Sequence, residues 1–288
     1  MNWILSAFGD EAGTRLDEQI AALQRGPIGY IDLRTIDEYN ISELPVDVAK
    51  TIKDKLDQAG IKISMLGSPI GKIDIADDMQ ADLDKLTHLA QLADLLDCRA
   101  IRIFSYYNKN AVGRDQWAAE SLARLGQLIG LASRLGLELY LENESNLYGD
   151  NGDSMLHIAE QYRDGKTFKM IFDFDNFNRA GDDVWENWLK LRDKTDAFHL
   201  KDSTADNMHV PVGQGTSRVK EILENAVAMG WSGPLSLEPH LAHSPAVLTT
   251  HVSGKAHQTL KDLSFADSFQ VGAKAAIKLL AEVGTNFS

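Results

Sequence analysis

Three acidic side chains and one histidine stand near the ends of four short apolar segments in the second half of the chain. They are Glu142, Asp173, His199 and Glu238. Alternate side chains of a β-strand point to opposite faces. In each segment one face is entirely apolar, and the residue in question belongs to the other face. If the segments are neighbouring parallel strands, three carboxylates and one imidazole meet at one end of the sheet.

Three carboxylates in one pocket repel one another unless a cation compensates their charge. Carboxylate oxygens with one imidazole suit Mn²⁺, Mg²⁺ or Co²⁺, and Zn²⁺ is a further candidate. Four protein ligands leave about two octahedral positions for substrate oxygens. The pattern therefore predicts one divalent metal ion bound by these four residues. The competing interpretation is four unrelated polar residues paired with basic side chains inside a barrel.

Eight short apolar segments recur along the chain, and amphipathic segments lie between them. The apolar segments are Trp3–Phe8, Tyr30–Ile36, Lys62–Leu66, Ala100–Phe104, Leu137–Glu142, Phe168–Asp173, Asp196–Lys201 and Pro234–Glu238. Helical periodicity is clearest in residues 45–59, 78–97, 115–135, 216–229 and 269–283. Strands that alternate with helices pair in parallel. Eight such units predict an α/β fold, a closed (β/α)8 barrel with its chemistry at the carboxyl ends of the strands.

We expect residues 1–288 to form a single domain, because neither a linker nor a shift of composition interrupts the pattern. A long loop at residues 240–266 follows the eighth strand, and a loop of that length is usually functional. The alternative fold is a doubly wound open sheet. That fold usually has a phosphate-binding turn after the first strand, and residues 9–13 are too acidic for one.

Composition excludes several classes of protein. The 288 residues are 44% hydrophobic and 25% charged, which is typical of a globular domain. A net charge of −13 argues against nucleic-acid binding. The single cysteine, Cys98, permits no intrachain disulfide, and the N-terminus lacks the basic region of a signal peptide. Because no apolar run is long enough to cross a bilayer, we expect a soluble cytoplasmic protein without membrane partners.

Six further polar residues lie in or after predicted strands and are predicted to contact a substrate at the barrel mouth. They are Lys72, Arg102, Glu144, Asn176, Lys201 and His209. For each the alternative is a solvent-exposed loop residue or a compensating charge inside the barrel. Glu138 and Lys169 are expected to form a structural ion pair deeper in the barrel. The histidines of the last loop suggest a metal-binding cluster, but their irregular spacing favours dispersed surface or subunit-contact residues; they are His240, His243, His251 and His257.

The strings that end the last four strands resemble those of the xylose isomerase-like TIM-barrel superfamily. They are Glu142-Asn143, Asp173-Phe-Asp-Asn176, His199-Leu-Lys-Asp202 and Leu237-Glu238-Pro239. This superfamily includes sugar isomerases and epimerases, inosose dehydratases and endonuclease IV. The resemblance implies that the four ligand residues bind one divalent metal and that Glu142 and Glu238 also act as an acid–base pair. It is also the only basis for expecting a homodimer.

The chain departs from the epimerases at two places. Asn176 stands where they carry a histidine, and residues 203–207 lack the arginine that they carry after the strand-seven histidine. Endonuclease IV fits less well, because it needs three zinc ions and many more histidines. Three functions remain open: a metal-dependent isomerase or epimerase of a keto-sugar or sugar phosphate, a metal-dependent lyase or dehydratase of a 3-keto-sugar or cyclitol, and a non-catalytic carbohydrate-binding barrel.

Overall fold

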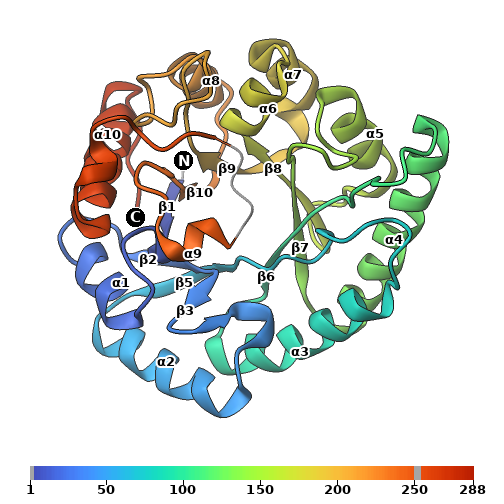
Figure 1. The fold of residues 1–288 in the computed structure, drawn as a ribbon, viewed down its shortest axis with the longest axis horizontal. Coiled ribbons are helices and arrows are strands. Elements are labelled where there is room, and N and C mark those ends of the chain that lie inside the picture. The colour runs from blue at the N-terminus through green and yellow to red at the C-terminus, as the bar shows by residue number, and fades with distance from the viewer. Residues whose placement is uncertain (1–2, 250–253) are drawn as a thin grey trace.

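The computed structural model describes residues 3–249 and 254–288. Eight parallel strands close into a barrel in the order β1-β10-β9-β8-β7-β6-β5-β2, and helices surround it (Figure 1). The strands are β1 (Trp3–Phe8), β2 (Tyr30–Leu33), β5 (Lys62–Leu66), β6 (Ala100–Ile103), β7 (Glu138–Glu142), β8 (Phe168–Asp173), β9 (Thr195–Leu200) and β10 (Gly233–Leu237). The predicted (β/α)8 barrel is confirmed, and each of the eight predicted segments overlaps one barrel strand, with shifts of up to three residues at the ends.

The predicted helical segments are also confirmed, with shifts of a few residues at their ends. The helices are α1 (Leu16–Leu23), α2 (Val46–Gln58), α3 (Gln80–Leu96), α4 (Arg114–Leu135), α5 (Gly152–Tyr162), α6 (Phe174–Ala180), α7 (Val184–Leu191), α8 (Val219–Ala228), α9 (Pro245–Leu248) and α10 (Phe265–Glu282). Among the described residues, no helix is both long and apolar enough to cross a bilayer.

One predicted strand is divided in two. The segment Tyr30–Ile36 contains β2 as far as Leu33, and β3 (Thr35–Ile36) then pairs with β4 (Tyr39–Asn40) as a small antiparallel hairpin. Between them, the backbone oxygen of Arg34 accepts a hydrogen bond from the Ile41 amide at 2.8 Å. The division places the Arg34 side chain just beyond the end of β2, at the barrel mouth.

The alternation of faces along the strands follows the sequence. Outward residues of β8 to β10 belong to the large apolar core between barrel and helices, where the rings of Phe172 and Phe198 pack with Trp188. Inward residues form a separate apolar cluster inside the barrel. It consists of Met65, Tyr140, Ile171 and Ala197. On β7, Tyr140 of this cluster separates Glu138 at the amino end of the strand from Glu142 at the carboxyl end. Buried polar side chains also lie within the barrel, where the Ser6 hydroxyl donates to Asp32 Oδ2 at 2.6 Å.

The long segment after β10 carries two short ordered pieces, α9 and a 3-10 turn at Leu260–Asp262. The Ser244 hydroxyl donates to the Asp10 carbonyl at 2.7 Å, which ties the start of α9 to the loop after β1. Farther along, the Lys255 amide donates to the Asn207 carbonyl at 2.7 Å, and the Lys255 carbonyl accepts from the His209 amide at 2.8 Å. The segment is thus hydrogen-bonded to the loop after β9, the strand next to β10.

Candidate metal centre

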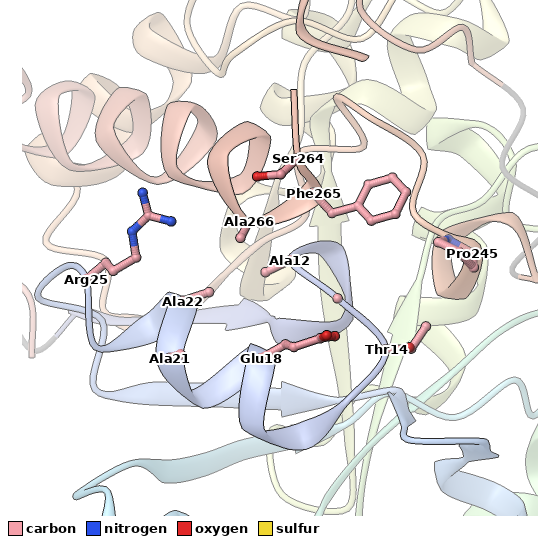
Figure 2. Close-up of a pocket in the computed structure, with 11 residues that line it drawn as sticks. Ala12, Thr14, Glu18, Ala21, Ala22, Arg25, Pro245, Ser264, Phe265 and Ala266 are labelled. Atoms are coloured by element: carbon pink, nitrogen blue, oxygen red, sulfur yellow. The ribbon is translucent and has the colours of Figure 1, made fainter. Parts of the chain in front are cut away.

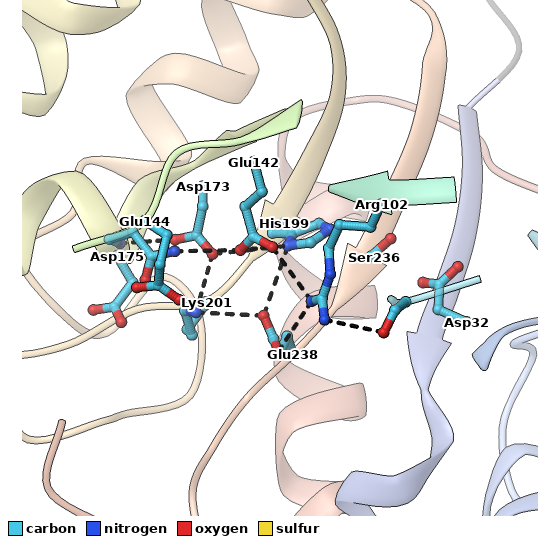
Figure 3. Close-up of polar contacts among 12 residues, drawn as sticks. Asp32, Arg102, Glu142, Glu144, Asp173, Asp175, His199, Lys201, Ser236 and Glu238 are labelled. Atoms are coloured by element: carbon cyan, nitrogen blue, oxygen red, sulfur yellow. Dashed lines mark hydrogen bonds and ion pairs between the residues drawn. The ribbon is translucent and has the colours of Figure 1, made fainter. Parts of the chain in front are cut away.

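Four ligand-type side chains meet at the carboxyl ends of β7 to β10 (Figure 3). Glu142 and Asp173 are the last residues of their strands, His199 is the register partner of Asp173, and Glu238 directly follows β10. One donor atom from each lies within 4.8 Å of the others, and all four side chains are buried. The structure therefore brings together all four residues that the sequence predicts as metal ligands.

His199 faces all three carboxylates. Its Nδ1 lies 3.0 Å from Glu142 Oε1, 3.6 Å from Glu238 Oε2 and 3.9 Å from Asp173 Oδ2. The ring of Phe8 packs edge-on against the imidazole, with the ring centroids 5.4 Å apart. The imidazole therefore has an apolar wall on one side and carboxylates on the other.

The Asp173 side chain also caps helix α6, and this contact fixes its orientation. Its Oδ1 accepts a hydrogen bond from the Asn176 amide at 2.8 Å and so caps the N-terminus of α6. The other oxygen, Oδ2, remains directed at the site. Asn143, the residue after Glu142, holds the backbone of Asp173 by hydrogen bonds of 2.8 and 3.0 Å.

Asn176, predicted to contact substrate, lies behind the cluster. It is 1% exposed. Its Nδ2 donates to Glu142 Oε1 at 3.2 Å and to the Asn143 carbonyl at 2.8 Å. The side chain therefore orients a predicted metal ligand, and its contact with substrate stays a prediction.

Two buried cations complete the electrostatics of the cluster. Lys201 Nζ lies 3.1 Å from Asp173 Oδ2 and 3.3 Å from Glu238 Oε2, and Figure 3 shows it between the two. Arg102 Nη1 lies 3.3 Å from Glu142 Oε2 and 3.9 Å from Glu238 Oε1. The prediction for both residues was substrate contact, and the structure shows that both already pair with cluster carboxylates.

These contacts shift the pKa values of the carboxyl groups in opposite directions. Burial raises the pKa of Glu142, but the charges of His199 and Arg102 outweigh it and bring the pKa to about 2. Burial is likewise outweighed at Glu238, chiefly by Lys201, and its pKa lies well below the usual range. At Asp173 burial dominates and the charge of Glu142 adds to it, so the pKa rises to about 8. Glu142 and Glu238 are thus ionised at neutral pH.

The donor set fits a divalent metal ion. Glu142 Oε2, Asp173 Oδ2 and both ring nitrogens of His199 are buried and form no hydrogen bond, although charged groups lie close to them. Buried polar atoms without such partners are rare and require an explanation. A bound cation would supply a partner for these atoms and would stabilise the ionised form of Asp173.

The remaining predicted residues lie around the cluster. At the mouth, Lys72 Nζ pairs with Glu144 Oε2 at 3.0 Å. His209 is buried, with Nδ1 at 3.6 Å from Asp175 Oδ2, and neither of its ring nitrogens forms a hydrogen bond. Burial lowers the pKa of His209 well below its usual value, so its ring is neutral.

The expected ion pair deeper in the barrel is confirmed. Lys169 Nζ contacts Glu138 Oε2 and also donates to the Tyr140 hydroxyl at 3.1 Å. Both charged residues lie near the amino ends of their strands, away from the metal-ligand cluster. The pair therefore belongs to the opposite end of the barrel.

The expectation of dispersed surface histidines in the last loop is wrong for His240. This residue is 3% exposed, and its Nδ1 is hydrogen-bonded to Glu11 Oε1 at 2.6 Å. Its Nε2 lies 3.6 Å from Glu238 Oε1, and its backbone has a positive φ of 49°. His243 packs against His209 with ring centroids 5.3 Å apart. His251 lies outside the described residues.

Arg34 is a further buried cation at the barrel mouth. Its guanidinium binds both oxygens of Asp10 at 2.8 Å, contacts Glu11 Oε1 at 3.2 Å, and contacts Glu238 Oε1. Among the described residues, Glu11, Glu238 and His240 form a second group whose donor atoms lie within 4.8 Å of one another. Arg34 already supplies a positive charge there, so this group has less need of a metal ion.

A separate groove of about 500 Å³ lies in the helical layer (Figure 2). Its lining comes from α1 and the residues on either side of it, from Pro245 of α9 and from the start of α10, and it includes Arg25 and Phe265. None of the predicted site residues contributes to it. The groove is therefore distinct from the cluster at the strand ends.

The family described as xylose isomerase-like TIM barrel matches residues 23–263 of the chain. The chain belongs to this family. An uncharacterized protein of Methanocaldococcus jannaschii, MJ1311, is 27% identical to this xylose isomerase-like chain over 124 residues. The match covers 41% of this chain and 42% of that relative, so the chain spans less than half of the curated relative it matches.

Solved structures share the fold of this xylose isomerase-like barrel at low identity. The IolI protein with a binding zinc atom is 15% identical, with a TM-score of 0.74 and coverage of 99% of this chain and 100% of that one. D-psicose 3-epimerase in the presence of D-fructose is 13% identical, with a TM-score of 0.74 and coverage of 98% and 100%. The probable 3-DHS dehydratase AsbF from Bacillus anthracis is 19% identical, with a TM-score of 0.67 and coverage of 88% and 98%.

Proposed function

We propose that the protein is a divalent-metal-dependent isomerase or epimerase that moves a proton at the carbon next to the carbonyl of a keto-sugar. One observation carries the proposal: four donor atoms from four consecutive strands lie within 4.8 Å of one another at the barrel mouth. Barrels of this kind place their chemistry at that end. The likeness to sugar epimerases supports the same reaction class.

Glu142, Asp173, His199 and Glu238 would hold the ion. Three carboxylates and one imidazole suit Mn²⁺, Mg²⁺ or Co²⁺, and the same residue types also ligate Zn²⁺. When bound, such an ion polarises a carbonyl and the adjacent hydroxyl and makes the neighbouring C–H proton more acidic.

Glu142 and Glu238 are suited to move that proton. Their low pKa values keep both in the carboxylate form, which accepts protons. They stand on β7 and β10, the two ends of the four-strand arc, with β8 and β9 between them. A substrate carbon placed between them can lose its proton to one carboxylate. The other carboxylate, once it has taken a proton from water, can deliver that proton to the opposite face of the carbon.

A lyase or dehydratase is the second candidate function. Lys201 lies 3.1 Å from Asp173, and Glu11 holds His240 with its Nε2 at 3.6 Å from Glu238. The positive charge of Lys201 and the polar ring of His240 beside the cluster would stabilise a departing hydroxyl, so that β-elimination from a 3-keto-sugar or cyclitol follows proton removal. The likeness to a probable dehydratase supports this option. Ultraviolet absorbance of an enone product would identify it.

Exchange with solvent deuterium tests the proposal. Protein loaded with Mn²⁺ is incubated in deuterated water with a panel of ketoses, and each sugar is analysed by NMR for deuterium at the carbon next to the carbonyl. We expect incorporation that stops on chelation, returns when Mn²⁺ is added back and is abolished by Glu238→Gln. Full turnover by Glu238→Gln would refute the acid–base role. Sugar binding by metal-free protein without exchange would instead favour a non-catalytic carbohydrate-binding barrel.

A further inference from the structure

A small cavity opens at the ends of β2, β5 and β6, beside the metal-ligand cluster. It has a volume of about 140 Å³. Its lining consists of Arg34, Asn40, Gly67, Pro69, Lys72, Arg102 and Thr249. Three of these side chains are cations, and none of the described residues that line the cavity carries a carboxylate.

The three cations are held against two phenylalanine rings. Arg34 lies 4.6 Å from the centroid of the Phe8 ring, and Lys72 lies 4.3 Å from that of Phe104. The Arg102 guanidinium lies 4.9 Å from both ring centroids. Aromatic faces stabilise cations without neutralising their formal charge. Three positive charges therefore lie around one small space, and the carboxylates that pair with them lie outside its lining: Glu144 with Lys72, Glu142 with Arg102, and Asp10, Glu11 and Glu238 with Arg34.

Lys72 is fixed in place by its glycine neighbour. Gly71 has a φ of +86°, and a Cβ there would lie 2.1 Å from the Phe104 carbonyl oxygen. Only glycine permits this approach. The Gly71 carbonyl accepts from the Tyr106 amide at 2.8 Å, and the Gly71 amide donates to Asp82 Oδ2 at 2.8 Å. The loop that carries Lys72 is thus clamped to the chain beyond β6.

Hydrogen-bond donors predominate in the lining. The Nε of Arg102 is buried and forms no hydrogen bond. The side-chain oxygen of Asn40 accepts from the amide and hydroxyl of Ser42, at 3.0 and 2.8 Å, so its NH₂ group remains a donor. A buried donor without an acceptor and three cations around one cavity are complementary to an anionic group.

The cavity is in direct contact with the proposed metal site. Arg102 both lines it and approaches Glu142 Oε2 to 3.3 Å, and Arg34 both lines it and pairs with Glu238. One water molecule takes about 30 Å³ of the liquid, so the cavity has room for about four or five non-hydrogen atoms. A carboxylate with its neighbouring carbon, or a phosphate, is of that size.

We propose that this cavity binds an anionic group of the substrate, a carboxylate or a phosphate, so that the protein acts on an acidic keto-sugar in preference to a neutral one. The inference rests on the proposed function for the position of the reacting carbon. Arg34, Lys72 and Arg102 hold the anionic group, and the carbonyl end of the same molecule then lies at the cluster. The anionic end of the substrate thereby contacts cationic side chains, and its carbonyl end lies at the metal-ligand cluster.

Direct binding tests the inference without turnover. The probes are D-fructose, D-fructuronate and D-fructose 6-phosphate, titrated calorimetrically into the full-length protein. We expect at least one anionic probe to bind about tenfold or more tightly than D-fructose at low salt, and this advantage to shrink at high ionic strength. Lys72→Met should reduce the advantage about tenfold while leaving the affinity for D-fructose within twofold. The control is Lys190→Met, which removes an ion-paired lysine of α7 far from the cavity.

The better anionic probe distinguishes a carboxylate from a phosphate, and both results support the inference. Equal affinity for the three probes overturns it, and so does a failure of all three to bind. An equal loss for all three probes in Lys72→Met also overturns it. The deuterium experiment tests the proposed reaction separately. If the protein prefers anionic probes but exchanges no deuterium, the cavity assignment stands and the proposed reaction is refuted.

Discussion

The two halves of the barrel mouth carry opposite chemistry. The half formed by β7 to β10 presents Glu142, Asp173, Glu238 and one imidazole to a single volume. The half formed by β2, β5 and β6 presents Arg34, Lys72 and Arg102 around a cavity. The first half is suited to a cation, and the second is suited to an anion.

The contrast shows how one barrel can orient a small polar molecule. Arg102 is the contact between the halves, because it lines the cavity and lies 3.3 Å from Glu142 and 3.9 Å from Glu238. Each half can be altered separately, since metal binding depends on one set of side chains and anion binding on the other. Variants that remove one property and keep the other are therefore the most direct test of the comparison.

The largest expected effect is that of Asp173→Asn on metal affinity. Asparagine retains the cap of α6 but loses the negative charge that faces the site. We expect Mn²⁺ affinity to fall more than about 100-fold, because losses of roughly 10- to 100-fold are typical of residues that only orient metal ligands. The affinity for the anionic probes should change little. Metal titration and elemental analysis after dialysis measure the effect.

A matched control for that variant is Asp183→Asn. Asp183 caps α7 by accepting from the amides of Trp185 and Glu186 at 2.9 and 3.2 Å, away from the cluster. The Asp183→Asn variant should bind Mn²⁺ as tightly as the unmodified protein does. If Asp173→Asn also retains full Mn²⁺ affinity, Asp173 is not a metal ligand and the acidic half has been misassigned.

A smaller loss is expected for Asn176→Ala. This change removes the hydrogen bond of 3.2 Å that orients Glu142, without removing a predicted ligand. We expect Mn²⁺ affinity to fall about 10- to 100-fold, as for other residues that orient metal ligands. Asn178→Ala is the control, because Asn178 lies on the same helix and contacts Ser203 and Thr216 instead. Equal effects of the two variants would contradict the orienting role.

The acidic half could be predicted from sequence because strand geometry fixes it. The side-chain period of two assigns each residue to a face, and the ends of Phe168–Asp173 and Leu137–Glu142 are visible in the pattern. No knowledge of the loops was needed to predict the four metal ligands, which are Glu142, Asp173, His199 and Glu238. The barrel itself followed from the same alternation of strands and helices.

The contacts of Arg34 and His240 were harder to predict, because they depend on loops and on long side chains. Arg34 reaches from the end of β2 to Glu238 after β10, a pairing that no local spacing encodes. His240 lies in a loop with a left-handed backbone, and its orientation depends on Glu11 from the other end of the chain. The one signal in the sequence for His240 was its position two residues after Glu238, a predicted metal ligand.

A further, smaller effect is expected in the cationic half for Arg102→Met. The variant loses a guanidinium that lines the cavity and keeps a side chain of similar length. We expect anionic-probe affinity to fall about tenfold, because an unpaired buried donor and one positive charge are removed. Mn²⁺ affinity should not decrease, since the variant also removes a cation next to Glu142. A loss of Mn²⁺ binding as large as that of Asp173→Asn would show that the two halves are not separable.

The smallest expected effect is that of Glu138→Gln. Glu138 shares the inward face of β7 with Glu142, so it is the same residue type on the same strand and face. It pairs with Lys169 at the amino end of the barrel, where its side chain is 42% exposed, and the apolar cluster of Met65, Tyr140, Ile171 and Ala197 lies between the two ends. Partly exposed ion pairs contribute only about 0–1 kcal/mol to stability. We therefore expect thermal unfolding to shift slightly, and Mn²⁺ and probe affinities measured by calorimetry to stay within twofold. A large loss of either affinity would mean that the charge of Glu138 affects the carboxyl end of the barrel through the apolar cluster. The position of Glu142 at that end would then no longer explain why Glu142, and not Glu138, binds the metal.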